Sequence, residues 1–200
     1  MPRAGLSTSR VIEEAETVVD EVGLPGLTLA TIAARLGVQI PSLYKHVAGM
    51  AALQTEVAIR AKNELAVTLA RASVGRAGDD AVLAISRAYR SWAKQHPGRY
   101  ATTQRATESG SESNVEATRA VLRVVTDAFV AYDMQGDDLI DAIRALRATL
   151  HGFIELELAG GFGLPVDVDR SFERAVRGLT ISLQHWQATN SGQSVDRPQG

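Results

Sequence analysis

The segment from Thr28 to Val47, TLATIAARLGVQIPSLYKHV, constrains the fold most, because it predicts two short helices joined by a tight turn. Thr28 can cap the first helix through its hydroxyl, and apolar residues then recur on one helical face. Gly37 follows where a helix would end in a left-handed conformation, which glycine adopts at little cost. Pro41 suits the first turn of a second helix, where no backbone N–H is needed. The segment therefore predicts a helix, a turn and a second helix.

The outer side of the predicted second helix is rich in polar side chains. Leu43 and Val47 lie one turn apart and should face the interior. Four other residues should therefore point largely outward, with Tyr44 at the edge: Gln39, Ser42, Lys45 and His46. A helix–turn–helix places its second helix in the major groove of DNA, while the first helix crosses the phosphate backbone. We therefore expect DNA contacts from both helices. The candidate residues are Gln39, Pro41, Ser42, Tyr44, Lys45 and His46 in the second helix, and Thr28, Thr31 and Arg35 in the first.

The charge pattern around this segment fits DNA better than the net charge of −2 does. No aspartate or glutamate occurs between residues 22 and 55, whereas Arg35 and Lys45 lie within that stretch. Acidic residues crowd the helix predicted over Arg10–Val22, on faces that we expect to turn away from DNA: Glu13, Glu14, Glu16, Asp20 and Glu21. Because two cations make only a modest patch, binding would also need hydroxyls, helix N-termini and repetition in a dimer.

Composition excludes several other classes of protein. Proline is sparse, 45% of residues are apolar, and no stretch alternates apolar and polar residues as a half-buried strand does, which predicts an all-helical globular fold. The absence of cysteine excludes disulfides, a thiolate nucleophile and a cysteine-based zinc site. No run reaches the ~18 apolar residues of a membrane span. We expect a cytoplasmic protein that does not contact a membrane.

Helical spacing predicts about nine helices in two domains. An N-terminal DNA-binding domain of residues 1–48 contains the three-helix motif. A long helix follows, Met50–Ala72, and its first part, to about residue 67, should be attached to this domain. A C-terminal helical bundle should span residues 49–189, and residues 190–200 should form a flexible tail. The polar residues of the long helix are expected to face solvent: Glu56, Arg60, Lys62 and Glu64.

The last two long helices each carry two packing stripes. Large residues recur in each helix at steps of four and three, the spacing of antiparallel helices that pack at a shallow angle. They are Leu139, Ile143, Leu146, Leu150 and Phe153 in the first helix, and Phe172, Val176, Leu179, Leu183 and Trp186 in the second. A second stripe of small groups favours a homodimer in which two such pairs form a four-helix bundle. The candidate interface residues are Ala142, Ala145, Thr149, Gly152, Ala175, Gly178, Ser182 and Trp186. The alternative is that both stripes are buried within one chain.

The sequence IAARLGVQIPSLYKHV resembles the DNA-binding signature of the TetR family of transcriptional regulators, with its alanine-rich helix, Gly-Val turn and Leu-Tyr-x-His. The sequence RALRATLHGFIELELAGGFG, followed by a helix, resembles the regulatory domain of one TetR subgroup. Gln39 departs from the family pattern, which has serine or threonine there as a helix cap. The resemblance implies a three-helix DNA-binding domain, a helical regulatory domain and dimerisation.

Candidate chemistry is limited to a ligand pocket, which the family resemblance implies. Aromatic walls and polar groups could come from Tyr89, Trp92, Tyr100, Gln104, Phe129, His151 and Glu155. For each aromatic residue, filling the core is the competing interpretation. The histidines are scattered over four segments and no serine lies in a nucleophile elbow, so we expect no catalytic residues, no cofactor and no metal site.

Together these features predict a dimeric repressor that binds a double-stranded DNA operator and is released by a small-molecule effector. Two alternatives remain open: a regulator that acts through a protein partner without an inducer, and a small-molecule binding protein with a degenerate DNA module. A small helical enzyme is a more remote alternative, which loss of turnover in His151→Ala would support.

Overall fold

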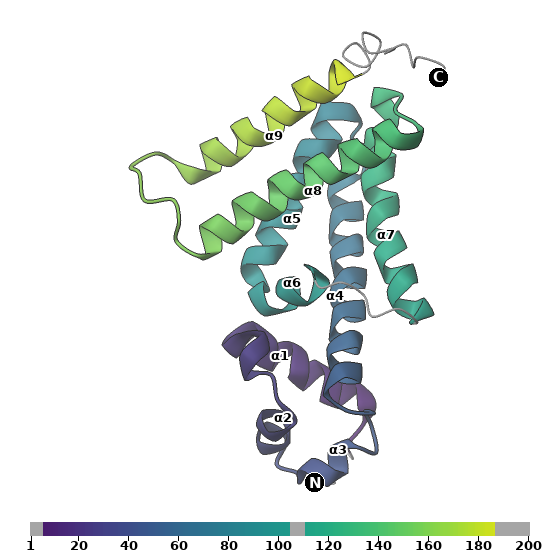
Figure 1. The fold of residues 1–200 in the computed structure, drawn as a ribbon, viewed down its shortest axis with the longest axis vertical. Helices are drawn as coiled ribbons and strands as arrows, with labels where there is room; N and C mark the ends of the chain where they lie inside the picture. The colour runs from purple at the N-terminus through teal and green to yellow at the C-terminus, as the bar shows by residue number, and fades with distance from the viewer. Residues whose placement is uncertain (1–5, 105–110, 187–200) are drawn as a thin grey trace, which may run out of the picture. The chain divides into compact units, whose positions relative to one another are not determined.

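The computed structural model describes residues 6–104 and 111–186, and regular secondary structure in this part of the chain is helical throughout (Figure 1). The all-helical prediction is confirmed. The described elements are α1 (Thr8–Gly26), α2 (Leu29–Leu36), α3 (Ile40–Leu43), α4 (Met50–Ser73), α5 (Gly78–Gln95), α6 (Pro97–Gln104), α7 (Glu112–Phe129), the 3-10 helix η1 (Val130–Tyr132), α8 (Gly136–Leu158) and α9 (Val168–Gln184).

The chain divides into two compact units. Unit 1 comprises residues 1–68 and 91–122, and unit 2 comprises residues 69–90 and 123–200. Helices α4, α5 and α7 therefore each contribute residues to both units. The domain boundary expected near residue 48 stays a prediction, and the expected tail at 190–200 lies outside the described residues.

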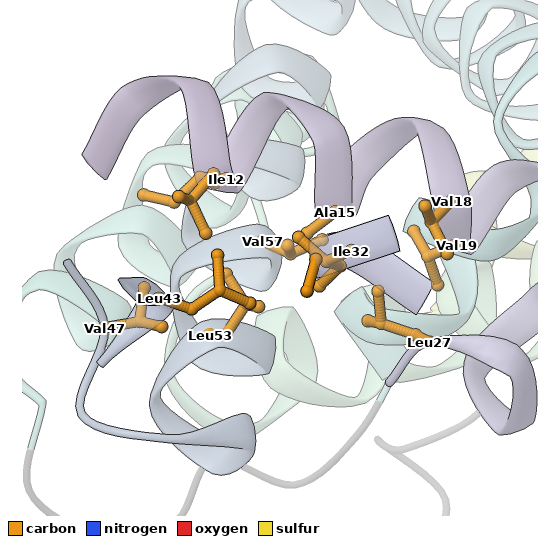
Figure 2. Packing of buried hydrophobic residues seen from close by; sticks show 12 residues of the cluster. Ile12, Ala15, Val18, Val19, Leu27, Ile32, Leu43, Val47, Leu53 and Val57 are labelled. Carbon is orange, nitrogen blue, oxygen red and sulfur yellow. The ribbon is translucent and has the colours of Figure 1, made fainter. Parts of the chain in front are cut away.

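The core of unit 1 is built on the inner stripe of α1. Val11, Ile12, Ala15, Val18 and Val19 recur at helical spacing and are at most 3% exposed. They pack with apolar side chains of the next three helices and the turns between them. Figure 2 labels six of these partners, Leu27, Ile32, Leu43, Val47, Leu53 and Val57, and the cluster also includes Ala33. This shared core fixes α2 and α3 on one side of α1.

Helix α6 packs on α1 within unit 1. A Cβ atom added to Gly98 would lie only 1.7 Å from the backbone oxygen of Val19, so the two backbones approach as closely as glycine allows. Beside this contact, the backbone N–H and the Nε–H of Arg99 both donate to the carboxylate of Asp20, at 2.7 Å each. Nη1 of Arg99 also donates to Glu64 at 2.6 Å, which ties α4 to the same junction.

Lys62 of α4 is buried, contrary to the expectation that it faces solvent. Its side chain reaches α7, where Nζ donates to Oδ1 of Asn114 at 2.6 Å and to Oγ1 of Thr118 at 3.0 Å. A long lysine side chain can be buried where such acceptors replace water. Periodicity along α4 cannot show these acceptors, because they lie on another helix.

Helices α8 and α9 lie side by side in unit 2 (Figure 1), and the residues of the predicted large-residue seam are buried or half-buried. Leu146 and Leu150 of α8 are buried, and so are Phe172, Val176 and Leu183 of α9. The other predicted seam residues are half-buried: Leu139, Ile143, Phe153, Leu179 and Trp186. Ala142 and Ile154 of α8 are fully buried instead, because the 3.6-residue helical period shifts the inner face along this helix.

Arg90 links α5 to α8 and α9 in unit 2. Its guanidinium donates two hydrogen bonds to the carboxylate of Glu157, at 2.6 and 2.7 Å, and lies 2.8 Å from Oδ1 of Asp169. The same group lies over the ring of Phe172, 4.7 Å from its centroid, and 5.6 Å from the centroid of Phe153. Hydrogen bonding to Glu157 raises the pKa of Arg90, so the guanidinium stays charged.

Candidate nucleic-acid interface

The predicted helix, turn and helix are present, although the second helix is short. Thr28 caps α2 by accepting the backbone N–H of Thr31 at 3.0 Å, and Gly37 ends α2 with φ 66°. Helix α3 covers only four residues, but the chain keeps turning because the backbone N–H groups of His46 and Val47 both donate to the carbonyl of Leu43, at 2.8 and 3.0 Å. This geometry gives α3 and the following turn one continuous outer face.

The outer face of α3 carries the predicted DNA-contacting side chains. Leu43 and Val47 are buried as predicted, which fixes the rotation of α3. Of the six candidates in this helix and turn, four are exposed and two, Ser42 and His46, are half-buried; the exposed residues are Gln39, Pro41, Tyr44 and Lys45. Gln39 makes no side-chain hydrogen bond to cap α3, in agreement with its departure from serine or threonine.

Ile40 also belongs to this face, and the sequence-based list omits it. Its side chain is 39% exposed, one turn before Tyr44, which is 58% exposed. The signal that could have identified it is this i, i+4 spacing from an outward-facing residue.

The hydroxyls of Thr28 and Thr31 are engaged inside the chain. Besides the cap, the two hydroxyl oxygens lie 2.9 Å apart, and Oγ1 of Thr31 is 3.2 Å from its acceptor, the carbonyl oxygen of Gly26. These bonds satisfy the first turn of α2 and link it to the end of α1. Phosphate contacts by the two threonines stay a prediction.

Arg35 is paired with carboxylates of α1. It forms an ion pair with Glu21 and another with Glu14, where Nη1 and Oε1 are 3.4 Å apart. The hydrogen bond from Arg35 lowers the pKa of Glu21 and raises that of Arg35. Arg35 therefore has to leave or share these partners to contact a phosphate.

The other acidic residues of α1 also have arginine partners within unit 1. Nη1 of Arg60 lies 3.9 Å from Glu13 and 3.6 Å from Glu16, and Arg99 holds Asp20. Burial raises the pKa of Glu16, and the charges of Arg60 and Arg99 oppose that rise. Lys45 differs, because no carboxylate within the described residues pairs with it. The negative charge of α1 is thus largely compensated, and Lys45 is available to a phosphate.

The predicted ligand-binding residues are distributed over both units. Unit 1 contains Trp92, Tyr100 and Gln104, and unit 2 contains Tyr89, Phe129, His151 and Glu155. Trp92 and Tyr100 are buried, and Nε1–H of Trp92 donates to Glu64 at 3.2 Å. Phe129 is buried against the edge of Tyr132, with ring centroids 5.9 Å apart. A single ligand site formed by these residues stays a prediction.

His151 and Glu155 lie one turn apart on α8, with Nδ1 and Oε1 separated by 3.9 Å. Among the residues that the structure describes, no three histidine or acidic side chains gather closely enough to hold a metal ion. A groove of about 410 Å³ in unit 2 is lined by other residues: Ala72, Arg76, Asp80, Leu83, Ala84 and Arg87. None of the predicted ligand-binding residues lines this groove.

The predicted dimer-interface residues differ in their exposure. Gly152, Gly178 and Ser182 are exposed along α8 and α9, and four more are half-buried: Ala145, Thr149, Ala175 and Trp186. Ala142 is fully buried within the chain and has no surface left for a partner. The rest of the predicted stripe keeps accessible surface.

No described helix combines the length and the apolarity that crossing a bilayer requires.

Comparison with known proteins gives consistent matches over most of the chain. Residues 82–179 match the family described as "Tetracyclin repressor-like, C-terminal domain". Rv0681 of Mycobacterium tuberculosis, named an uncharacterized HTH-type transcriptional regulator, is 35% identical over 182 residues, which cover 90% of this chain and 83% of that protein. YobS of Bacillus subtilis, with the same description, is 29% identical over 188 residues, which cover 91% of this chain and 95% of that protein.

The fold is also shared with solved structures. The crystal structure of a TetR variant from Acinetobacter baumannii AYE, in complex with minocycline, has a TM-score of 0.69 at 20% identity. The match covers 91% of this chain and 98% of that chain. At this identity the similarity is one of fold.

Proposed function

Because the chain belongs to the TetR family of transcriptional regulators, we propose that it binds a double-stranded DNA operator through α2, α3 and the turn that follows. The observation that carries this proposal is the outer face of α3. It exposes Tyr44 and Lys45 beside a buried anchor of Leu43 and Val47, while arginines compensate the carboxylates of α1. A helix placed in the major groove brings such exposed side chains within reach of base edges and phosphates.

We propose that the chain acts in the cytoplasm as a repressor and that a small-molecule effector releases it from DNA. The candidate effector contacts are those predicted from the sequence: Tyr89, Trp92, Tyr100, Gln104, Phe129, His151 and Glu155. By linkage, effector and operator would weaken each other's binding by the same factor. Repeating an operator titration with candidate effectors tests this coupling.

Replacing Tyr44 and Lys45 by alanine together tests the DNA-binding proposal. The variant should bind the DNA beside its own gene about 10- to 100-fold more weakly, because phosphate contacts are lost in both copies of a dimer. The slope of log K against log salt should also fall by about two. Fluorescence anisotropy of a labelled fragment over a range of salt concentrations measures both quantities.

The matched control for this variant is Arg119→Ala, which removes a positive charge from α7. Arg119 is exposed, and its Nη1 lies 4.0 Å from Oε2 of Glu116. This control should keep the affinity and the salt dependence of the parent. An unchanged affinity in the Tyr44 and Lys45 variant would contradict the proposed role of α3.

We propose that the homodimer forms through the exposed small-residue stripe on α8 and α9. Replacing Gly178 by arginine should abolish dimerisation, because a long charged side chain cannot enter a close helix–helix contact. The single chain should tolerate it, since no atom lies within 4 Å of the added Cβ and arginine favours a helix more than glycine does. Analytical ultracentrifugation should show a monomer with native helix content.

The control for the dimer variant is Gly163→Arg in the loop between α8 and α9. Its Cβ also meets no atom within 4 Å, but it lies outside the predicted stripe. This variant should remain dimeric. If Gly178→Arg is as dimeric as the parent, the interface lies elsewhere.

A further inference from the structure

Ile40 and Tyr44 form an apolar edge on the outer face of α3. The two side chains lie one turn apart and are 39% and 58% exposed. Ile40 is not part of the core cluster of unit 1, which takes Leu43 and Val47 from this segment. The edge borders exposed Lys45, so it belongs to the surface that the proposed function turns toward DNA.

A single exposed isoleucine is common on protein surfaces, so its exposure alone has no functional meaning. Its position is what restricts its partner. An aliphatic side chain cannot form hydrogen bonds, and the base edges in the major groove display donors and acceptors, with one apolar group, the C5-methyl of thymine. Packing Ile40 against any other base edge would remove water from a polar group without replacing its hydrogen bond.

We infer that Ile40 is a specificity-determining residue that reads a thymine in each operator half-site by packing against its C5-methyl group. This inference rests on the proposed DNA-binding function and adds the chemistry of one base pair to it. The side chain suits the task, because β-branching leaves isoleucine few rotamers in a helix and so little freedom to lose on binding.

Deoxyuridine substitution tests the inference, because it removes only the methyl group of a thymine. The probe is the DNA fragment beside the gene, narrowed by footprinting, with each thymine replaced in turn at symmetric positions of both half-sites. For the parent protein, one such replacement should weaken binding by about fourfold per half-site, or about 15-fold per operator, the value expected for one buried methyl group at each.

The Ile40→Ala variant should lose this sensitivity. Its affinity for the operator that contains thymine should fall. It should bind the operator that contains deoxyuridine with the same, reduced affinity, so the losses caused by the substitution and by removal of the methyl group are not additive. Ile40→Val, which keeps the branched shape and removes one methyl group, should show an intermediate response. Val67→Ala is the control, because Val67 is 50% exposed on α4 in the same unit and should keep the parent's profile.

Each outcome decides between the inference and the function on which it rests. If Ile40→Ala and Ile40→Val discriminate the same thymine as strongly as the parent, Ile40 does not read it and the inference is wrong, although DNA binding stands. The same conclusion follows if no thymine methyl matters to the parent. If the parent shows no salt-dependent binding to the fragment, the proposed function itself fails.

Discussion

Replacing Arg90 by alanine should lower the free energy of unfolding by about 3–5 kcal/mol, as measured by urea denaturation of the full chain. The Arg90 side chain is 11% exposed and its Glu157 partner 14%, so the pair is largely shielded from water. Removing the guanidinium takes two hydrogen bonds from Glu157, a carboxylate that is largely shielded from water, and also removes the contacts of Arg90 with the rings of Phe153 and Phe172. Desolvation of that carboxylate is the main cause of the expected loss.

Two variants make the Arg90 prediction specific. Arg87→Ala removes an arginine from the same helix whose ion pair with Glu173 is at the surface, with side chains 52% and 36% exposed, and should cost less than about 1 kcal/mol. Arg90→Lys keeps the charge but loses the bidentate geometry and the ring contacts. Its free energy of unfolding should therefore lie between those of the parent and of Arg90→Ala. Equal stability of Arg87→Ala and Arg90→Ala would show that the buried ion pair does not hold α5 to α8 and α9.

The features that the sequence predicted well depend on residues close together in the chain. The cap at Thr28, the left-handed Gly37 and the inward pair of Leu43 and Val47 all follow from spacing within one or two helical turns. The outward direction of Lys45 follows from the same spacing, whereas Tyr44, expected at the edge of this face, is 58% exposed. For this reason the fold of the candidate DNA interface could be read before its structure was known.

The features that the sequence could not predict depend on partners far along the chain. Arg90 meets Glu157 across 67 residues, and Lys62 meets Asn114 across 52. Periodicity assigned Lys62 to solvent because it shows which face of a helix a residue occupies but not what packs there. The pairing of Arg35 with Glu14 and Glu21, which limits its use toward DNA, was hidden for the same reason.

The candidate ligand residues show the same limit. Trp92, Tyr100 and Phe129 have the spacing of both core residues and pocket walls, and each is at most 4% exposed. Only their surroundings distinguish the two roles. Trp92 already donates to Glu64 and lies against His96, with ring centroids 5.4 Å apart, so it has a structural role in unit 1 whatever it does for a ligand.

Replacing Gly98 by alanine should separate α6 from α1 and destabilise unit 1 by about 3–5 kcal/mol, the sum expected for overpacking and for lost hydrogen bonds to a charged group. The new Cβ would lie 1.7 Å from the oxygen and 2.2 Å from the carbon of the Val19 carbonyl, and 2.7 Å from the Asp20 nitrogen. All three are backbone atoms, so no side chain can rotate away to make room.

The loss at Gly98 should extend to DNA binding, because α1 supplies the core on which α2 and α3 are packed. When α6 moves, the two bonds from Arg99 to Asp20 break, and the C-terminal half of α1 loses its anchor. Urea denaturation and operator titration of the same sample should therefore show parallel losses, while Gly163→Ala, whose Cβ meets no atom within 4 Å, should change neither. A Gly98→Ala protein as stable as the parent would mean that α1 and α6 are not in backbone contact. The packing of α2 and α3 on α1 would then not depend on α6.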